Sequence, residues 1–216
     1  MIAQLQHAEC FDAEAGLWVE TMRPPFARPT PALFIDRDGV LVEETHYLHR
    51  AADVSLIPGA AEVVARANRL GIPVIVVTNQ AGIGKGLYDW TAFREVQDAI
   101  ICELAARGAT IDAVLACPYH EKGLGIWRHF AHPARKPKPG MLLHAAEMLN
   151  LDLAASWIVG DHYTDLLAGY AASLRGGMHV LTGRGAADRS FVASLQLPDF
   201  DLRLGESIRQ ADALFA

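Results

Sequence analysis

The sequence has 216 residues, a formal net charge of −6 and no dense cluster of basic side chains, which argues against binding along a nucleic-acid backbone. No apolar run approaches the roughly 18 residues of a transmembrane helix, and the N-terminus lacks the pattern of a signal peptide. The three cysteines have no framework spacing, as in proteins of a reducing compartment, so we expect a cytoplasmic protein.

The first 30 residues differ in pattern from the rest of the chain. They mix Phe11, Leu17 and Trp18 with acidic side chains and end in a proline-rich, extended connection. We interpret residues 1–30 as an N-terminal appendage, either a short helix or an arm that covers apolar surface. The hydrophobic fraction of 51 % is enough for a large core, and we assign that core to one domain, residues 31–216.

Short β-prone apolar runs then alternate with segments of helical periodicity. The expected strands are 32–35, 72–77, 111–116, 156–160 and 178–181, and the expected helices begin near Pro58, Thr91, Met141 and Asp165, with a last one over 206–214. Thr91 is the expected N-cap of its helix. This alternation predicts an α/β fold: a three-layer, Rossmann-like parallel sheet with helices on both faces.

Two carboxylates, Asp36 and Asp38, directly follow the first apolar run and are followed by Gly39. On these residues alone, a solvated Asp-x-Asp-Gly turn is the simpler interpretation. The buried strand before them argues for a site instead, because parallel α/β sheets bind ligands at the carboxyl ends of their strands. A multivalent cation or a shared proton would relieve the repulsion between the two carboxylates.

Polar side chains also follow the later strands. Thr78 and Asn79 end the second strand, Cys117 the third and Asp161 the fourth, while Arg135 and Lys136 come from the loop in between. Aspartates at one sheet edge form an oxygen-rich site that suits Mg²⁺. With a hydroxyl and fixed cations nearby, this set indicates phosphoryl transfer.

Each of these features has a simpler explanation when taken alone. Thr78 and Asn79 equally suit a turn cap, and lysines such as Lys136 are mostly solvated. Asp161 and Asp165 suit the positive end of a helix dipole, and the glycines at 82–86 lack the ending of a Walker loop. The joint occurrence of these residues, in order and at strand ends, favours the site.

In this order the residues resemble the four motifs of the haloacid dehalogenase superfamily of phosphatases. The matching stretches are Asp36-Arg37-Asp38-Gly39, Thr78-Asn79-Gln80, Arg135-Lys136-Pro137 and Gly160-Asp161-x-x-x-Asp165. The resemblance covers roughly residues 31–185. Within the superfamily the motifs look most like the branch of D-glycero-D-manno-heptose-1,7-bisphosphate 7-phosphatases, to which the histidinol-phosphate phosphatases are close relatives.

The resemblance implies roles for individual residues. Asp36 would attack phosphorus and form an aspartyl-phosphate, and Asp38 would act as general acid and then as base. Thr78 and Lys136 would hold the transferring phosphoryl group. Mg²⁺ would bind the Asp36 carboxylate, the Asp38 backbone carbonyl and Asp161, with Asp165 orienting the metal shell or Lys136.

The positions aligned with substrate contacts are Glu44, Thr45, His46, Tyr47, Asn79, Gln80, Ala81, Arg135 and His162. His162 stands where the family often has Lys, which puts one phosphate contact in doubt. Only about 20 residues separate the first motif from the next helix, too few for a large cap domain. We therefore expect an open site whose substrate is selected by loops 43–50, 82–88 and 118–134.

The branch usually carries a structural Zn²⁺, and this sequence departs from its ligand pattern. Tyr119 stands at the expected histidine, and His132 and Ala134 stand at two expected cysteines. Cys117, His120, His129 and His132 still offer zinc-type ligands, but a metal-free loop held by packing is the preferred interpretation.

These features predict a Mg²⁺-dependent phosphomonoesterase, a monomer, that acts on a small phosphate ester, with the 7-phosphate of the heptose bisphosphate as the first candidate. Histidinol-phosphate phosphatase or another small-metabolite phosphatase is the alternative among hydrolases. Phosphotransfer to an acceptor other than water is a third possibility. A catalytically inactive binding module with the same fold is the alternative of a different class, and the intact Asp36/Asp38 pair argues against it.

Overall fold

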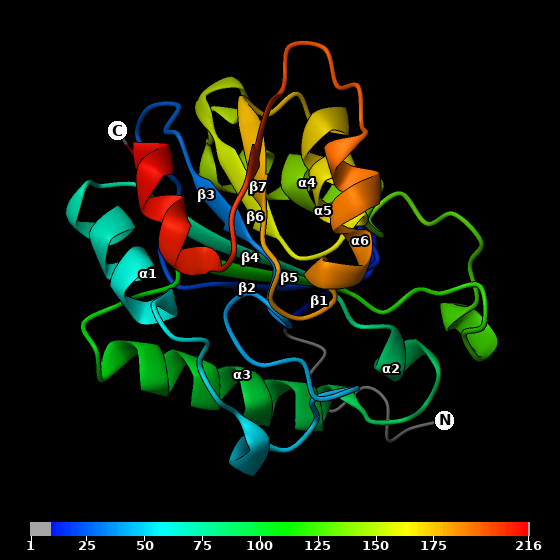
Figure 1. Cartoon of the computed structure of the whole chain (residues 1–216). Coiled ribbons are helices and arrows are strands. Elements are labelled where there is room, and N and C mark those ends of the chain that lie inside the picture. The colour runs from blue at the N-terminus through cyan, green and yellow to red at the C-terminus, as the bar shows by residue number, and fades with distance from the viewer. Residues whose placement is uncertain (1–9, 216) are drawn as a thin grey trace.

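The computed structural model describes residues 10–215, so the first nine residues of the expected appendage lie outside the described range. In this part of the chain, eight strands form one sheet in the order β1-β2-β5-β4-β3-β6-β7-β8 (Figure 1). The strands are β1 (Phe11–Asp12), β2 (Leu17–Thr21), β3 (Leu33–Ile35), β4 (Val74–Asn79), β5 (Ala113–Cys117), β6 (Trp157–Gly160), β7 (Gly176–His179) and β8 (Asp201–Leu204). From β5 across to β8 they pair in parallel, which confirms the predicted α/β sheet.

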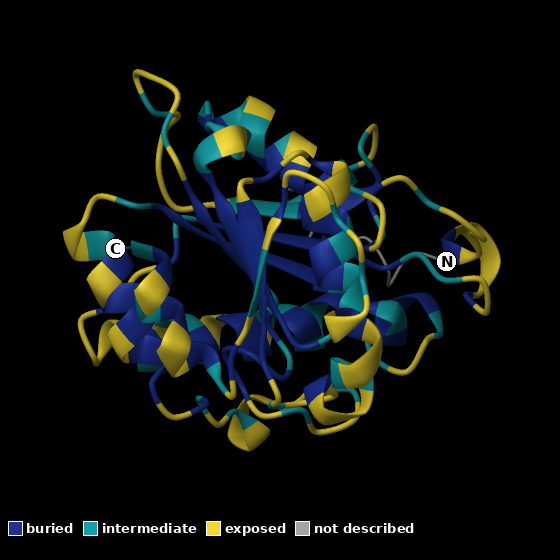
Figure 2. Cartoon of the chain, turned by 45° about the horizontal axis from the view of Figure 1, so that its top comes forward, coloured by how far each residue is buried: buried dark blue, intermediate teal, exposed yellow. Residues whose placement is uncertain are grey.

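Helices cover both faces of the sheet, as the alternation of apolar segments predicts (Figures 1 and 2). The α-helices are α1 (Ala60–Arg69), α2 (Ala81–Gly84), α3 (Trp90–Ala105), α4 (Gly140–Leu149), α5 (Tyr163–Ala171) and α6 (Gly185–Ala193). Short 3₁₀ helices occur at η2 (Ala51–Asp53), η3 (Gly125–Trp127), η4 (Leu153–Ala155) and η5 (Ile208–Phe215). Among the described helices, none has both the length and the apolar character needed to cross a membrane.

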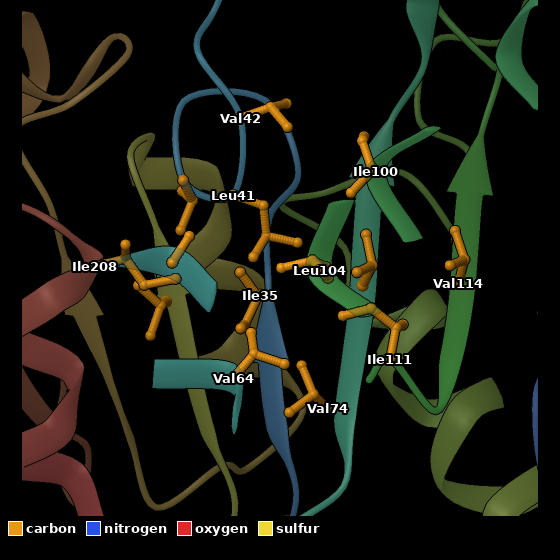
Figure 3. Close-up of a cluster of buried hydrophobic side chains, with 14 of the residues drawn as sticks. Ile35, Leu41, Val42, Val64, Val74, Ile100, Leu104, Ile111, Val114 and Ile208 are labelled. Atoms are coloured by element: carbon orange, nitrogen blue, oxygen red, sulfur yellow. The ribbon is translucent and has the colours of Figure 1, made fainter. Parts of the chain in front are cut away.

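Side chains of the central strands alternate between two hydrophobic clusters, because successive residues of a strand point to opposite faces. Leu33 and Ile35 of β3 join a cluster with α1, α3 and η5, part of which Figure 3 shows, whereas Phe34 joins a cluster with α4 and α5. Both faces are therefore buried, which explains why these strands read as continuous apolar runs rather than as alternating ones.

The first strands of the chain form a hairpin that extends this sheet. β1 pairs with β2, and β2 pairs antiparallel with β5, with Trp18 opposite Ala116. Trp18 is fully buried and stacks on Trp90 of α3 at a centroid distance of 5.1 Å. Over residues 11–21 the segment is therefore not a helix but a strand pair that packs on the domain as part of its sheet.

The position of β3 determines where ligands bind. β3 lies between β4 and β6. After β3, the chain first adds β4 and β5 on one side of it and then adds β6, β7 and β8 on the other side. At such a switch point the loops after neighbouring strands diverge and leave a crevice at their carboxyl ends. Between β3 and α1 there is only a loop with η2, which agrees with the expected lack of a large cap.

Candidate active site

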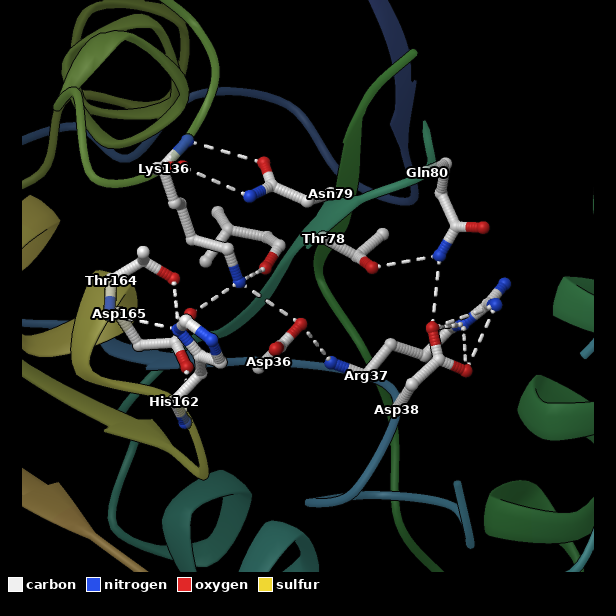
Figure 4. Close-up of polar contacts among 11 residues, drawn as sticks. Asp36, Arg37, Asp38, Thr78, Asn79, Gln80, Lys136, His162, Thr164 and Asp165 are labelled. Atoms are coloured by element: carbon white, nitrogen blue, oxygen red, sulfur yellow. Dashed lines mark hydrogen bonds and ion pairs between the residues drawn. The ribbon is translucent and has the colours of Figure 1, made fainter. Parts of the chain in front are cut away.

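Asp36 follows β3 at this crevice, and its backbone N–H donates to the Val159 carbonyl of β6 at 3.0 Å. Lys136 reaches it from the loop before α4: its Nζ lies 3.0 Å from Asp36 Oδ1 and 2.6 Å from Asp165 Oδ1 (Figure 4). The same Nζ donates to the Val77 carbonyl at 2.7 Å. Lys136 is only 2 % exposed, so this cation is fixed in place rather than solvated, contrary to the usual behaviour of lysine.

Lys136 is held through its backbone as well as through its ammonium group. The Asn79 side chain accepts from the Lys136 N–H at 3.1 Å and donates to the Lys136 carbonyl at 3.0 Å. This reciprocal pair joins the end of β4 to the loop before α4. Asn79 was expected to contact substrate; it lines the cavity, but its side-chain hydrogen bonds hold Lys136.

Asp36, Asp161 and Asp165 form the acidic cluster of the site, with one oxygen from each lying within 4.8 Å of the others. Burial raises the pKa of Asp36 to about 7, against the lowering effect of Lys136 and with a further rise from Asp165. Burial and the charge of Asp36 raise the pKa of Asp161 to about 8. Crowded, desolvated carboxylates of this kind disfavour their own ionised forms unless a cation is present.

The donor set therefore fits a hard divalent cation such as Mg²⁺. Gly39 and Gly183 leave room beside Asp161, because a Cβ at either glycine would lie 2.3 or 2.1 Å from Asp161 Oδ2. The Arg184 N–H donates to the same oxygen at 2.7 Å, which fixes the carboxylate. Asp165 is already engaged by Lys136 and by the His162 N–H, which agrees with an orienting function for it.

Asp38 is held away from the acidic cluster by two side chains. The Arg37 guanidinium, fully buried and 5.2 Å from the Phe93 ring centroid, lies 2.9 Å from Asp38 Oδ2. Gln80 Nε2 donates to the same oxygen at 3.0 Å and to Thr78 Oγ1 at 2.8 Å. Asp36 and Asp38 thus have different partners, although they are two residues apart in sequence. Asp36 pairs with Lys136, and Asp38 pairs with Arg37 and Gln80.

These residues line a cavity of about 220 Å³. Of the positions expected from the sequence to contact substrate, those lining it are Glu44, His46, Tyr47, Asn79, Gln80, Ala81, Arg135 and His162. Thr45 is not among the lining residues, and its side chain lies on the exposed part of the loop. His162 caps α5, with its Nδ1 accepting from the Thr164 N–H at 3.3 Å.

Several lining residues were not named as substrate contacts from the sequence. Lys85 donates to the Tyr47 hydroxyl at 2.9 Å, and the Tyr88 hydroxyl donates to Gln80 Oε1. The others are Leu48, His120, Thr164 and Arg184. Thr164 lies in the first turn of α5, and the others come from connecting segments, where no periodic pattern indicates which side chains turn inward. The available signal was that Leu48, Lys85, Tyr88 and His120 lie in the three loops expected to select substrate.

Within the described residues, the side chains whose ligand atoms lie close enough together to hold a metal ion are those of Asp36, Asp161 and Asp165. Cys117, His120 and His132 do not form such a cluster there. The Nδ1 atoms of His120, His129 and His132 each accept from a backbone N–H two residues further on. Tyr119 instead stacks on His132 at 3.8 Å and 4° and contacts Trp127 edge-on. Packing of aromatic rings holds loop 118–134 in this structure.

Comparison with known proteins gives a family assignment. Residues 18–173 match the model of the haloacid dehalogenase-like hydrolases. The chain belongs to this family. It is 44 % identical over 179 residues to the D-glycero-β-D-manno-heptose-1,7-bisphosphate 7-phosphatase of Mesorhizobium japonicum, covering 82 % of each chain. It is 34 % identical over 158 residues to the enzyme of that name from Escherichia coli K12, covering 73 % of this chain and 83 % of the relative.

Solved structures give the same family. A protein from Mesorhizobium loti described as a haloacid dehalogenase-like phosphatase superimposes with a TM-score of 0.83 at 39 % identity, covering 94 % of this chain and 93 % of that one. The D,D-heptose 1,7-bisphosphate phosphatase of B. bronchiseptica, solved with magnesium and phosphate, has a TM-score of 0.72 at 29 % identity, covering 86 % and 98 %. These relatives thus share the fold of this chain.

Proposed function

We propose that the protein is a Mg²⁺-dependent phosphatase that removes the 7-phosphate of D-glycero-D-manno-heptose 1,7-bisphosphate. It is a phosphoric monoester hydrolase, and its relatives from M. japonicum and E. coli carry the name of this heptose phosphatase. The observation that carries the proposal is the contact of Lys136 with both Asp36 and Asp165 beside Asp161. An attacking oxygen, a buried cation and metal-type ligands then share one small volume.

In the first step an Asp36 carboxylate oxygen attacks phosphorus, and the bond from phosphorus to the sugar oxygen breaks. Asp38 gives its proton to the departing alkoxide, which leaves as the sugar hydroxyl. In the second step Asp38 takes a proton from water, whose oxygen attacks the aspartyl-phosphate and releases inorganic phosphate. Asp36 is regenerated as a carboxylate and Asp38 as an acid, so both groups return to their starting states.

Lys136 and Thr78 hold the phosphoryl oxygens during both steps, since one supplies a fixed charge and the other a hydroxyl. Asp36, Asp161 and the Asp38 carbonyl would hold Mg²⁺, with Asp165 orienting Lys136. The ion, when bound, would neutralise charge that develops on the transferring group.

A substrate with two phosphate groups agrees with the other cations of the cavity. Lys85, Arg135 and Arg184 line it together with Lys136, although the whole chain has a net charge of −6. Arg135 is held in place because its guanidinium donates to the Tyr119 carbonyl at 3.1 Å. A second phosphate group of the substrate would therefore be attracted by the positive side chains of the cavity, although the net charge of the chain is negative.

The proposal is tested with a panel of phosphate esters: both anomers of heptose 1,7-bisphosphate, histidinol phosphate and simple monophosphates. We expect the highest kcat/KM for a heptose bisphosphate, loss of turnover in EDTA and its return with Mg²⁺. Asp36→Asn, which keeps the shape of the side chain, should be inactive and controls for contaminating phosphatases. A preference for histidinol phosphate, or equal rates across the panel, would contradict the heptose assignment.

A further inference from the structure

The Gln80 side chain faces the site instead of capping the helix that it precedes. Gln80 is the N-cap residue of α2, yet its side chain makes no capping hydrogen bond. It is 2 % exposed, and its Nε2 donates to Thr78 Oγ1 and to Asp38 Oδ2, as Figure 4 shows. Both hydrogens of one amide nitrogen are therefore used on two residues of the proposed catalytic site.

A carboxamide can be turned by 180° with almost no change of shape, so something must select this orientation. In the turned state Gln80 Oε1 would face the Asp38 carboxylate, and the two acceptors would repel each other. The Thr78 hydroxyl would also have to donate to Oε1. Its single hydrogen would then be used within the protein and would not reach a ligand.

The Asp38 carboxylate, which can only accept, disfavours the turned state, and the Tyr88 hydroxyl stabilises the observed orientation by donating to Gln80 Oε1. Burial raises the pKa of Tyr88, so the phenol keeps its proton and remains a donor. The Tyr88 ring has little freedom to move. It packs on Gly82, where an added Cβ would lie 2.1 Å from Tyr88 Cε1. It also stacks on the His49 ring, with an angle of 14° between the two ring planes.

We propose that Tyr88 is a positioning residue of this phosphatase site: it orients the Gln80 amide so that Thr78 accepts from Gln80 and can donate its own hydrogen to the phosphoryl group. The same amide hydrogen-bonds Asp38 and so fixes the starting position of that carboxylate. The inference rests on the proposed phosphatase function, and it adds a residue from loop 82–88 that acts through Gln80.

The direct test is Tyr88→Phe, which keeps the ring and removes the hydroxyl. We expect kcat/KM to fall about three- to tenfold on the ester that the wild type turns over best, as for loss of one hydrogen bond. Inhibition by inorganic phosphate should weaken by a similar factor, because phosphate uses the same Thr78 donor. The matched control is Tyr170→Phe, since Tyr170 is 39 % exposed, lies outside the cavity lining and should leave both values unchanged.

A double-mutant cycle separates positioning from general structural damage. In a Thr78→Val background no hydroxyl remains to be oriented, so Tyr88→Phe should cost clearly less than it does in the wild type. Gly82→Ala provides an independent variant, because it keeps the Tyr88 side chain but the added methyl would lie 2.1 Å from Cε1 and 2.9 Å from the hydroxyl oxygen, and so displaces both the ring and the hydroxyl. It should reproduce the loss of kcat/KM and the weaker phosphate inhibition.

The outcomes distinguish this inference from the proposed function. An active wild type with unchanged kinetics in Tyr88→Phe overturns the inference alone. Equal costs of Tyr88→Phe in the wild type and in Thr78→Val overturn it too, since Tyr88 would then act independently of Thr78. A wild type that hydrolyses none of the esters overturns both the proposed function and the inference.

Discussion

The buried negative charge of Asp161 disfavours the folded state unless a cation offsets it. The residue is 3 % exposed, and burial together with the neighbouring Asp36 raises the pKa of its carboxyl group to about 8. Within residues 10–215 its carboxylate accepts from the Arg184 N–H, and an amide oxygen at the same position could equally accept this hydrogen bond. The charge of Asp161 thus opposes folding while it prepares the site for a divalent ion.

We therefore expect Asp161→Asn to unfold at a temperature a few degrees higher than the wild type in EDTA, since it removes one of three crowded carboxylates. Mg²⁺ should raise the unfolding temperature of the wild type but not of this variant, which should also lack activity. Differential scanning fluorimetry with a Mg²⁺ titration measures both effects. The hypothesis of a metal site at this cluster fails if Mg²⁺ stabilises the variant as much as the wild type.

How far the site could be predicted differs between its residues. Asp36, Thr78 and Asp161 follow apolar strands directly, so the rule that parallel strands share one edge brings them together without any knowledge of loops. Lys85 and Tyr88 could not be assigned roles in this way. Their side chains face the cavity because α2 turns the chain back after β4, a path that depends on packing rather than on local sequence.

Helix α3 shows the same limit at the level of an element. Apolar residues at helical spacing predicted this helix and its approximate length. They did not predict its N-cap correctly: Thr91 was expected at that position, and the N-cap is Asp89. The Asp89 side chain accepts from the Ala92 N–H at 3.0 Å. Both residue types are good caps, so the choice depends on where the preceding loop leaves its extended conformation.

Asp89→Ala should reduce the free energy of unfolding by about 1 kcal/mol, the usual cost of losing an N-cap. Asp98→Ala is a matched control on the same helix, because Asp98 is exposed and its ion pair with Arg94 spans 3.9 Å. Urea unfolding monitored by circular dichroism measures both. Equal stabilities of the two variants would contradict the assignment of Asp89 as the cap.

Loop 118–134 should be sensitive to acid through His132. Burial and, to a smaller extent, His129 lower the pKa of His132 below the ordinary 6.5. Between the folded and unfolded pKa values the folded ring binds fewer protons. Its stabilising contribution is therefore complete above about pH 6.5 and is lost as the pH falls.

His132→Phe keeps a flat ring against Tyr119 and removes the titration. We expect the fall in unfolding temperature between pH 7.5 and pH 5.5 to be smaller in this variant than in the wild type. Differential scanning calorimetry at the two pH values measures the difference. A variant as acid-sensitive as the wild type would mean that other groups, such as His120, account for the effect.

Over the whole molecule, the N-terminal hairpin and loop 118–134 are joined by aromatic contacts. Phe11 and Trp90 each contact Trp127 edge-on, at 5.4 and 6.5 Å, and Trp90 stacks on Trp18. The sequence did not predict this hairpin. Its strands are short and partly polar, and β2 gains its stability from β5, which is distant in the chain.

Trp18→Ala should lower the free energy of unfolding by about 3–5 kcal/mol, because it opens a cavity at a fully buried position. The loss should extend to loop 118–134 through Trp90 and Trp127. Amide hydrogen exchange followed by mass spectrometry should show faster exchange in both segments. Unchanged exchange in the loop would show that the hairpin does not support it.

The central place of β3 also has a consequence for biosynthesis. One neighbour of β3 follows early in translation, but β6, which brings Asp161 beside Asp36, is made more than a hundred residues later. On the ribosome, β3, which leads into the proposed nucleophile Asp36, must therefore wait with one edge unpaired until its second neighbour emerges. The hydrolytic centre is consequently among the last parts of the polypeptide to mature, and nascent chains that stop before β6 should have no turnover.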